Sequence, residues 1–179
     1  MSLKPKHFLQ GKKYFHVTLT YQASSLLKQL DWLFVQKIIA RFSARFEIEI
    51  QAFVLMDSHL HLIVASTQPY ENYFAEAVQI ALGRVTKDSH ACEEIKNFSQ
   101  YLNTYKYVYR NPLEAGMCSL VQTYEYSSLN SILGKNQMSL PIHDQLGLIQ
   151  NPFHILNWLN SKNHYKNSKL SWLADENAG

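Results

Sequence analysis

The sequence has little of what marks membrane, fibrous or disulfide-stabilised proteins. Its 179 residues include two cysteines, six glycines and five prolines, too few for a disulfide framework, a collagen-like repeat or a low-complexity chain. No apolar run reaches the ~18 residues that a membrane span needs, and the longest candidate, residues 26–46, is interrupted by charged side chains. With 46% hydrophobic residues, we expect one soluble domain with a substantial core and no membrane segment.

The start of the chain carries basic residues with no apolar segment after them. We therefore expect no secretory signal and place the protein in the cytoplasm. Cys92 and Cys118 match neither a metal knuckle nor a redox pair, so we expect two free thiols in a reducing compartment.

Positive charge is concentrated near the amino terminus. The formal net charge is +3, but residues 1–45 hold eight Lys and Arg against one acid, and the rest of the chain holds nine against thirteen. Such segregation favours a surface that faces a polyanion such as nucleic acid. A solvated basic helix face is the alternative.

The first part of the chain predicts the order strand, helix, strand, strand. Residues 14–21 are rich in β-branched and aromatic side chains and alternate, which predicts a first strand. Residues 48–55 and 59–64 are two further β-rich runs, and we expect these two to form a hairpin. Between them, apolar residues recur at helical spacing after Ser24, a candidate N-cap. This predicted buried stripe contains Leu27, Leu30, Phe34, Ile38, Phe42 and Phe46.

The second part predicts two long helices, at residues 71–82 and 92–110, with Pro112 ending the second. The last strand of the sheet then has to lie within residues 84–91. Near the carboxyl terminus, Asn151 and Pro152 predict a short helix that runs to about Ser161.

This order is that of a ferredoxin-like (RRM-like) α+β sandwich, an antiparallel sheet with helices packed on one face. We expect that domain at residues 1–140 and a C-terminal helical appendage at residues 141–179.

Two histidines stand two positions apart on the predicted hairpin. Alternation along a strand puts His59 and His61 on one face of the sheet and Leu60, Leu62 and Val64 on the other. Such a pair can chelate one metal ion; the alternative is two exposed or hydrogen-bonded histidines.

One tyrosine of the second long helix does not fit its apolar stripe. The stripe contains Ile95, Phe98, Leu102, Tyr105 and Tyr109, at steps of three and four. At about 100° per residue, Tyr107 lies on the opposite, polar side, with Asn111 one turn further on. We therefore expect Tyr107 to have a polar partner.

Four ordered segments together resemble one family. AFVLMDSHLHLIV at residues 52–64 resembles the "HUH" motif of single-tyrosine DNA transposases, and YVYRNPLEAG at 107–116 resembles a segment of their REP-associated tyrosine transposase branch. GKKYFHVTLT at 11–20 and YEYSS at 124–128 stand where that family has similar segments.

The resemblance implies a metal-dependent endonuclease that acts on single-stranded, hairpin-containing DNA and rejoins strands through a 5′-phosphotyrosine. Tyr107 aligns with the family's nucleophile, and His59, His61 and Asn111 with the ligands of one Mg²⁺ or Mn²⁺ ion. It also implies a monomer or homodimer. From the charge pattern and the resemblance we expect DNA contacts from Lys12, Lys13, Lys37, Arg41 and Arg110.

Two other functions stay open. A hairpin-binding protein without turnover would keep the sheet and the basic surface but not the chemistry. A metalloprotein unrelated to DNA would use His59 and His61 for zinc, although no further His or Cys stands at an obvious ligand spacing.

Overall fold

The computed structural model describes residues 11–21, 31–83, 90–147 and 149–162. In chain order its elements are β1 (Lys13–Thr20), α2 (Trp32–Arg45), β2 (Glu49–Leu55), β3 (His59–Ser66), α3 (Glu71–Ala81), β4 (His90–Ile95), α4 (Phe98–Glu114), the 3-10 helix η2 (Val121–Thr123), α5 (Leu129–Ile132) and α6 (Pro152–Asn160). No helix in these ranges combines the length and the apolar character needed to cross a membrane.

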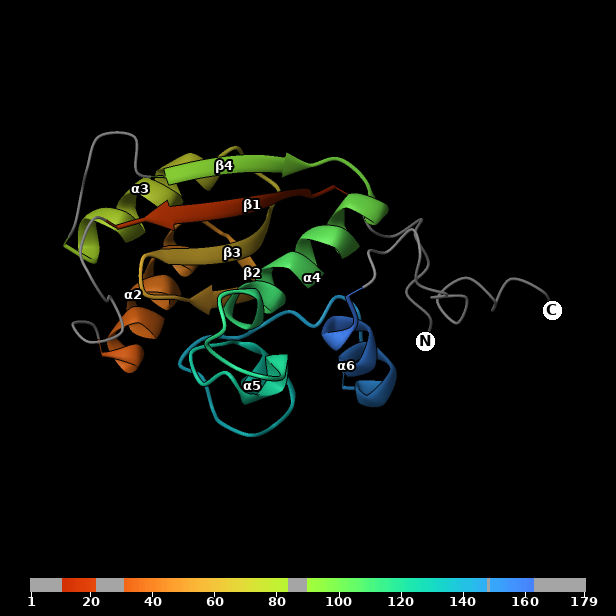
Figure 1. Ribbon diagram of the computed structural model, residues 1–179. Helices are drawn as coiled ribbons and strands as arrows, with labels where there is room; N and C mark the ends of the chain where they lie inside the picture. The colour runs from red at the N-terminus through yellow and green to blue at the C-terminus, as the bar shows by residue number, and fades with distance from the viewer. Residues whose placement is uncertain (1–10, 22–30, 84–89, 148, 163–179) are drawn as a thin grey trace.

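The four strands form one antiparallel sheet in the order β2-β3-β1-β4 (Figure 1). This is the strand order of a ferredoxin-like α+β sandwich, so the predicted fold class is confirmed. The predicted hairpin is also confirmed, because β2 and β3 are neighbours joined by the short turn at residues 56–58.

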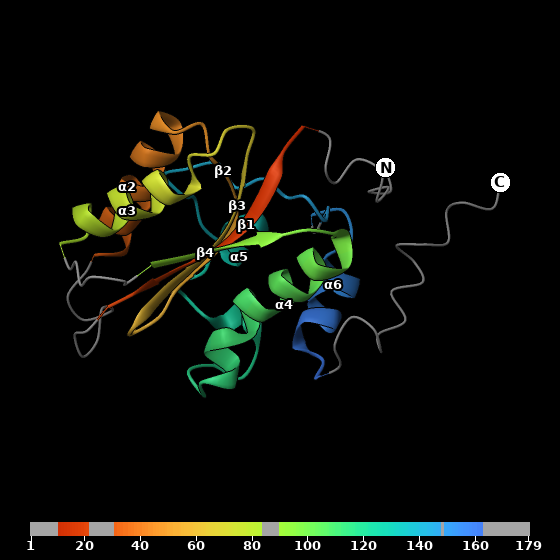
Figure 2. The ribbon, with the colours of Figure 1, turned by 90° about the horizontal axis from the view of Figure 1, so that it is seen from above.

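Helices cover both faces of the sheet, whereas we expected them on one face only. The two helices of the sandwich, α2 and α3, pack on one face, where Val17, Phe53 and Leu62 are fully buried. The opposite face is covered in part by α4 (Figure 2), which packs on Val54 and Ile63. Because both faces are covered, β2 and β3 are buried almost throughout.

The stripe by which α2 packs is shifted from the predicted one. Its buried apolar residues are Val35 and Ile39, whereas Phe34 is 42% exposed and Ile38 is only partly buried. Apolar residues stand in adjacent pairs at 34–35 and 38–39, so helical spacing fits either stripe. The sheet selects one of the two.

The start of α2 is fixed by Asp31. The Asp31 side chain accepts a hydrogen bond from the Leu33 backbone N–H at 3.1 Å, which satisfies one of the amides that a helix leaves unpaired at its first turn. The predicted N-cap Ser24, with Leu27 and Leu30, lies outside the described residues.

The boundary between the last strand and the second long helix was predicted wrongly. β4 occupies residues 90–95, pairing Ile95 with Tyr14, and α4 begins only at Phe98. The Asn97 side chain caps the helix by accepting from the Gln100 N–H at 2.9 Å. Since β4 is a polar edge strand, it lacks the alternation that marks a half-buried strand.

The helix also continues past Pro112, where we expected it to end. Proline lacks the N–H for one helical hydrogen bond, and its ring crowds the carbonyl four residues back, yet here the next turn of the helix still forms. The Ala115 N–H donates to the Asn111 carbonyl at 2.9 Å, and the Met117 N–H donates to the Pro112 carbonyl at 2.8 Å.

Three tyrosines of α4 lie in the core beneath the sheet. Tyr105 and Tyr109 are buried as predicted, with ring centroids 4.8 Å apart, and Tyr101, which the predicted stripe omits, is fully buried as well. The Tyr109 hydroxyl lies 2.9 Å from Ser128 Oγ, which accepts from the Phe53 N–H at 2.8 Å.

The short C-terminal helix has the predicted bounds, with Asn151 as N-cap and Pro152 in its first turn. It is not isolated from the rest of the fold. Ile155, Trp158 and Leu159 belong to the same hydrophobic cluster as the tyrosines of α4. The division of the chain after residue 140 stays a prediction.

We expect Tyr105→Ala to lower the free energy of unfolding by about 3–5 kcal/mol, because it removes a fully buried aromatic ring. Tyr107→Ala changes a 52% exposed side chain two positions away and should lower it by less than about 1 kcal/mol. Denaturant titration measures both values. Equal losses would contradict the assignment of these tyrosines to different sides of α4.

Candidate functional site

Side chains from three strands and α4 line a pocket of about 610 Å³ on the α4 face of the sheet. Strand pairing assembles it: Thr18 stands opposite His61, and His16 stands opposite Glu93. Since alternate residues share a face, these side chains and His59 point to the same side. The lining residues are His16, Thr18, Met56, His59, His61, Glu93, Asn103, Thr104, Tyr107 and Asn111.

Three imidazoles lie in a row across this face. The ring centroids of His16 and His61 are 5.4 Å apart and those of His59 and His61 are 5.7 Å apart, with planes within 16° and 14° of parallel. The structure thus brings the two predicted histidines together and adds a third, His16, from β1.

The Tyr107 ring meets this row edge-on. Its centroid is 5.7 Å from that of His16 and 5.8 Å from that of His61, and both contacts are close to perpendicular, at 83°. The side chain is 52% exposed, while Tyr105 and Tyr109 are buried. The prediction that Tyr107 leaves the apolar stripe is confirmed, and its ring contacts two imidazoles. A polar partner for its hydroxyl stays a prediction.

One nitrogen of each paired histidine is already occupied. His59 Nδ1 lies 2.7 Å from Ser58 Oγ, and His61 Nδ1 lies 3.3 Å from both Thr18 Oγ1 and His16 Nε2. Partners of this kind orient the ring of a metal-binding histidine. They leave Nε2 of His59 and of His61 as the atoms for a ligand in the pocket.

Burial keeps the inner histidines neutral. Burial first, and then the neighbouring His16 and His59, lower the pKa of His61 to about 3. Burial also lowers the pKa of His16, although the Glu93 carboxylate opposes this shift. A neutral imidazole is the form that binds a metal ion.

Asn111 supplies the amide that lines the same pocket. Its Nδ2 is buried and has no hydrogen-bond partner among the described residues. An unpaired buried amide is costly, and rotation of the side chain would place Oδ1 there instead. In either orientation this amide has bonding capacity that the protein itself does not use.

The donor set fits a divalent ion. Two neutral imidazoles and an amide oxygen are acceptable ligands for Mn²⁺ and, less favourably, for Mg²⁺. In the part of the chain that the structure describes, no three His, Cys, Asp or Glu side chains gather as a metal site. A metal ion at this position would therefore depend on Asn111 as its third protein ligand.

The cations that we expected to contact DNA do not gather around the pocket. Lys12 Nζ lies 2.6 Å from the Glu49 carboxylate and Lys13 Nζ lies 3.9 Å from that of Glu94. Both lysines stand at the start of β1, away from the pocket lining. The exposed Lys37 and Arg41 lie on α2, across the sheet from α4 (Figure 2).

Arg110 is a departure from expectation. Its side chain is buried, and Nη1 donates to the backbone carbonyls of Leu159, at 3.0 Å, and Ser161, at 2.7 Å. Its Nε and Nη2 donate to the Glu114 carboxylate, and this hydrogen bond lowers the Glu114 pKa. We expected Arg110 on an exposed DNA-binding surface. The structure instead places it in the contact between α4 and the end of α6.

Sequence reasoning missed His16, Thr18 and Glu93. His16 and Thr18 stand two apart on a predicted strand, which is the same spacing that singled out His59 and His61. That spacing could have drawn attention to them, but only the pairing of β1 with β3 shows that the two pairs meet.

No family model and no curated protein matches the sequence. Eight chains of solved structures match the fold. One is described as the structure of the REP-associated tyrosine transposase bound to a REP hairpin, with 18% identity, a TM-score of 0.59, and coverage of 75% of this chain and 87% of that chain. The likeness shows that this chain shares the fold of that transposase.

We expect Arg110→Ala to lower the free energy of unfolding by about 1–3 kcal/mol, because it leaves buried carbonyls without a donor. Arg41→Ala, at an exposed position on α2, should change it by less than about 0.5 kcal/mol. Thermal and denaturant unfolding measure both variants. If Arg110→Ala were as stable as Arg41→Ala, the proposed role of Arg110 in holding α4 to α6 would be wrong.

Proposed function

We propose that this protein is a metal-dependent single-strand DNA endonuclease and strand transferase that acts on hairpin-containing DNA. The observation that carries the proposal is the position of Tyr107, a half-exposed phenol set edge-on against His16 and His61 in a pocket that also contains His59 and Asn111. The shared fold with a hairpin-bound tyrosine transposase supports DNA as the substrate.

The residues divide the chemistry between them. The Tyr107 hydroxyl oxygen attacks a backbone phosphorus, and the new tyrosyl O–P bond forms as the P–O3′ bond breaks. The phenol proton leaves to solvent, and the departing O3′ takes up one proton from solvent. The products are a 5′-phosphotyrosine and a free 3′-OH. A 3′-OH can reverse the exchange and rejoin strands without ATP, because the number of phosphoester bonds is unchanged.

His59, His61 and Asn111 would hold the divalent ion, whose chemistry is to neutralise charge on the phosphate under attack. Ser58 and Thr18 orient the two imidazoles through Nδ1, so these hydroxyls act as positioning groups. The edge contacts of Tyr107 with the imidazoles keep its ring at the mouth of the same pocket.

Contact with DNA would come from the exposed cations of the first half of the chain. Lys12, Lys13, Lys37 and Arg41 are the residues we propose for the phosphate backbone, and the affinity should fall with added salt as counterions are released. We propose a monomer or homodimer in the cytoplasm. The alternative is a hairpin-binding protein without turnover. The phenol of Tyr107 and the amide of Asn111, whose Nδ2 has no hydrogen-bond partner among the described residues, favour the enzyme.

The test of the nucleophile is Tyr107→Phe, which removes one oxygen from a half-exposed side chain. We expect it to abolish the covalent protein–DNA adduct that forms with labelled hairpin DNA and Mn²⁺, while hairpin binding stays within about twofold and the free energy of unfolding within about 1 kcal/mol of the parent. Denaturing electrophoresis detects the adduct. Tyr105→Phe, two positions away on the same helix, is the matched control and should retain it. An adduct with Tyr107→Phe would show that another residue is the nucleophile.

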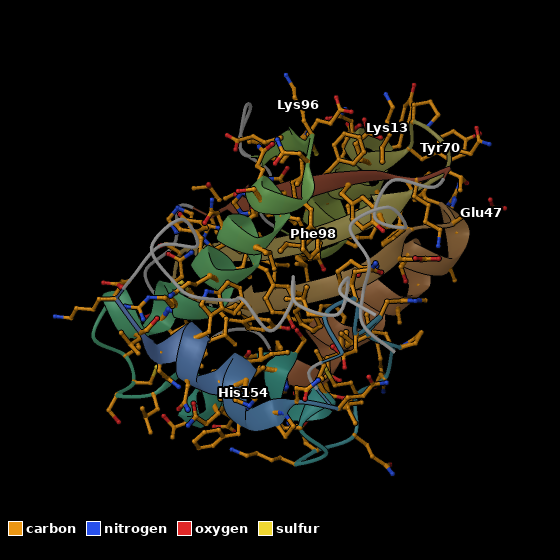
Figure 3. All side chains as sticks on the ribbon, turned by 90° about the vertical axis from the view of Figure 1, so that its right-hand side faces the viewer. Lys13, Glu47, Tyr70, Lys96, Phe98 and His154 are labelled. Atoms are coloured by element: carbon orange, nitrogen blue, oxygen red, sulfur yellow. The ribbon has the colours of Figure 1, made fainter. Side chains whose placement is uncertain are left out.

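The test of the metal site is His59→Ala and, separately, His61→Ala. Each variant should lose Mn²⁺ binding, measured by electron paramagnetic resonance on the protein alone, and with it the adduct. His154→Ala, on α6 (Figure 3) and outside the pocket lining, should bind Mn²⁺ as the parent does. Undiminished adduct formation by either pocket variant would remove the metal from the mechanism.

A further inference from the structure

A continuous row of aromatic rings and cations runs along α2 and onto the start of α3, on the face of the sheet opposite Tyr107. Phe42 and Phe46 have ring centroids 6.4 Å apart, Phe46 and Tyr70 6.3 Å, and Tyr70 and Tyr73 6.4 Å. In Figure 3, Tyr70 projects at the end of the molecule away from His154. We call Phe42, Phe46, Tyr70 and Tyr73, with the cations described next, the aromatic row.

Cations line the α2 side of the aromatic row. Lys37, Arg41 and Arg45 follow each other at four-residue spacing, so they form one exposed line along the helix. The Arg41 guanidinium lies 5.9 Å from the Phe42 ring centroid, and that of Arg45 lies 5.6 Å from the centroid of Phe46.

No carboxylate of the described residues forms an ion pair with this line of cations. α2 contains no acidic residue, and none of the ion pairs found among the described residues includes Lys37, Arg41 or Arg45. The exposed acids on the adjoining segments are Asp31, Glu47 and Glu76, and none of them takes part in an ion pair among the described residues. The line therefore carries three cations without a bonded anion.

Tyr70 and Tyr73 are more exposed than structural packing requires, while Phe42 and Phe46 are partly buried against the core. Tyr73 is 61% exposed and Tyr70 is 41% exposed, whereas the tyrosines that α4 contributes to the core are fully buried. Exposed aromatic rings next to unpaired guanidinium groups are the combination that binds unpaired nucleotides, since bases stack on the rings and phosphates meet the cations.

The positive charge of the aromatic row disfavours a second copy of this chain as its binding partner. A two-fold contact through the aromatic row would set the same patch against itself, and so bring Lys37, Arg41 and Arg45 close to their own copies. Like charges placed across an interface oppose association. A polyanion has the complementary charge.

We propose that the aromatic row binds an unpaired segment of the DNA that flanks the hairpin. The proposal rests on DNA as the substrate, as in the proposed function, but not on Tyr107 or the metal site. Bases in a stem are already stacked in the duplex, so only unpaired bases are free to stack on Phe42, Phe46, Tyr70 and Tyr73.

The experiment compares one hairpin with and without a single-stranded tail, by fluorescence anisotropy at fixed salt. Tyr70→Ala/Tyr73→Ala should weaken binding of the tailed hairpin about tenfold or more, as expected for lost base stacking, and leave the untailed hairpin within twofold. Tyr70→Phe/Tyr73→Phe keeps both rings and should bind like the parent. Ile80→Ala, which removes another exposed apolar side chain of α3, is the matched control and should also bind like the parent.

The cations are tested in the same assay. Arg41→Gln/Arg45→Gln should weaken binding of the tailed hairpin and reduce the dependence of its affinity on salt. At saturating DNA, the tyrosine variants and Ile80→Ala should form the Tyr107 adduct in the same amount as the parent, because the aromatic row and the pocket lie on opposite faces of the sheet. Thermal unfolding checks that each variant is folded.

The proposal would be overturned if Tyr70→Ala/Tyr73→Ala bound the tailed hairpin as tightly as the parent, or if it lost affinity equally for the tailed and the untailed hairpin. It would also be overturned if this variant lost binding only to vesicles of phosphatidylserine and phosphatidylcholine, because the aromatic row would then bind a lipid surface. Failure of the proposed function has a different signature. If the parent protein bound the tailed hairpin more tightly than the untailed one but formed no adduct, the proposed role of the aromatic row would stand and the proposed endonuclease activity would be wrong.

Discussion

The antiparallel pairing of β1 with β3 is the constraint on which the candidate site depends. Its register sets Thr18 opposite His61 and brings His16 alongside. A slip by one residue would turn every side chain of β3 to the other face, and exposing Leu60 and Leu62, both fully buried, would cost about 1.5–3 kcal/mol each. That cost is a large share of the free energy of unfolding of an ordinary domain. Burial of the apolar face of β3 therefore fixes the imidazoles of His59 and His61 on the opposite face of the sheet.

Much of the arrangement could be predicted where one periodicity dominates. The strand at 13–20 alternates in part between buried and more exposed positions, and the two-residue period of a strand alone places His59 and His61 on one face. The helical period separates Tyr107 from Tyr105 and Tyr109 for the same reason, because a side chain 200° away from a buried stripe has to face elsewhere. These predictions depend on local geometry that tertiary packing has no reason to change.

The errors arise where local patterns are ambiguous. Ile95 and Phe98 stand three apart, so the end of β4 continues the helical spacing of α4, and only pairing with β1 and the Asn97 cap separate the two elements. Adjacent apolar pairs in α2 admit two stripes, of which the sheet selects one. The burial of Arg110 could not be predicted either, since its carbonyl partners lie some 50 positions along the chain, at Leu159 and Ser161.

The contact between α4 and α6 explains how the half-exposed Tyr107, the proposed nucleophile, can be held in place. The side chains that flank Tyr107 in sequence, Lys106 and Val108, are both buried, and Lys106 Nζ donates to Ser161 Oγ at 2.8 Å and lies 5.5 Å from the Trp158 ring centroid. The sheet and α6 thus pack on different sides of α4. The strip of α4 left to line the pocket includes Asn103, Tyr107 and Asn111 at four-residue spacing, with Thr104 next to the first of them. Tyr107, the proposed nucleophile, and Asn111, the third proposed ligand, share this strip, so a rotation of α4 would displace both side chains together. By packing against α4, the helix α6 therefore contributes to the site without lining the pocket.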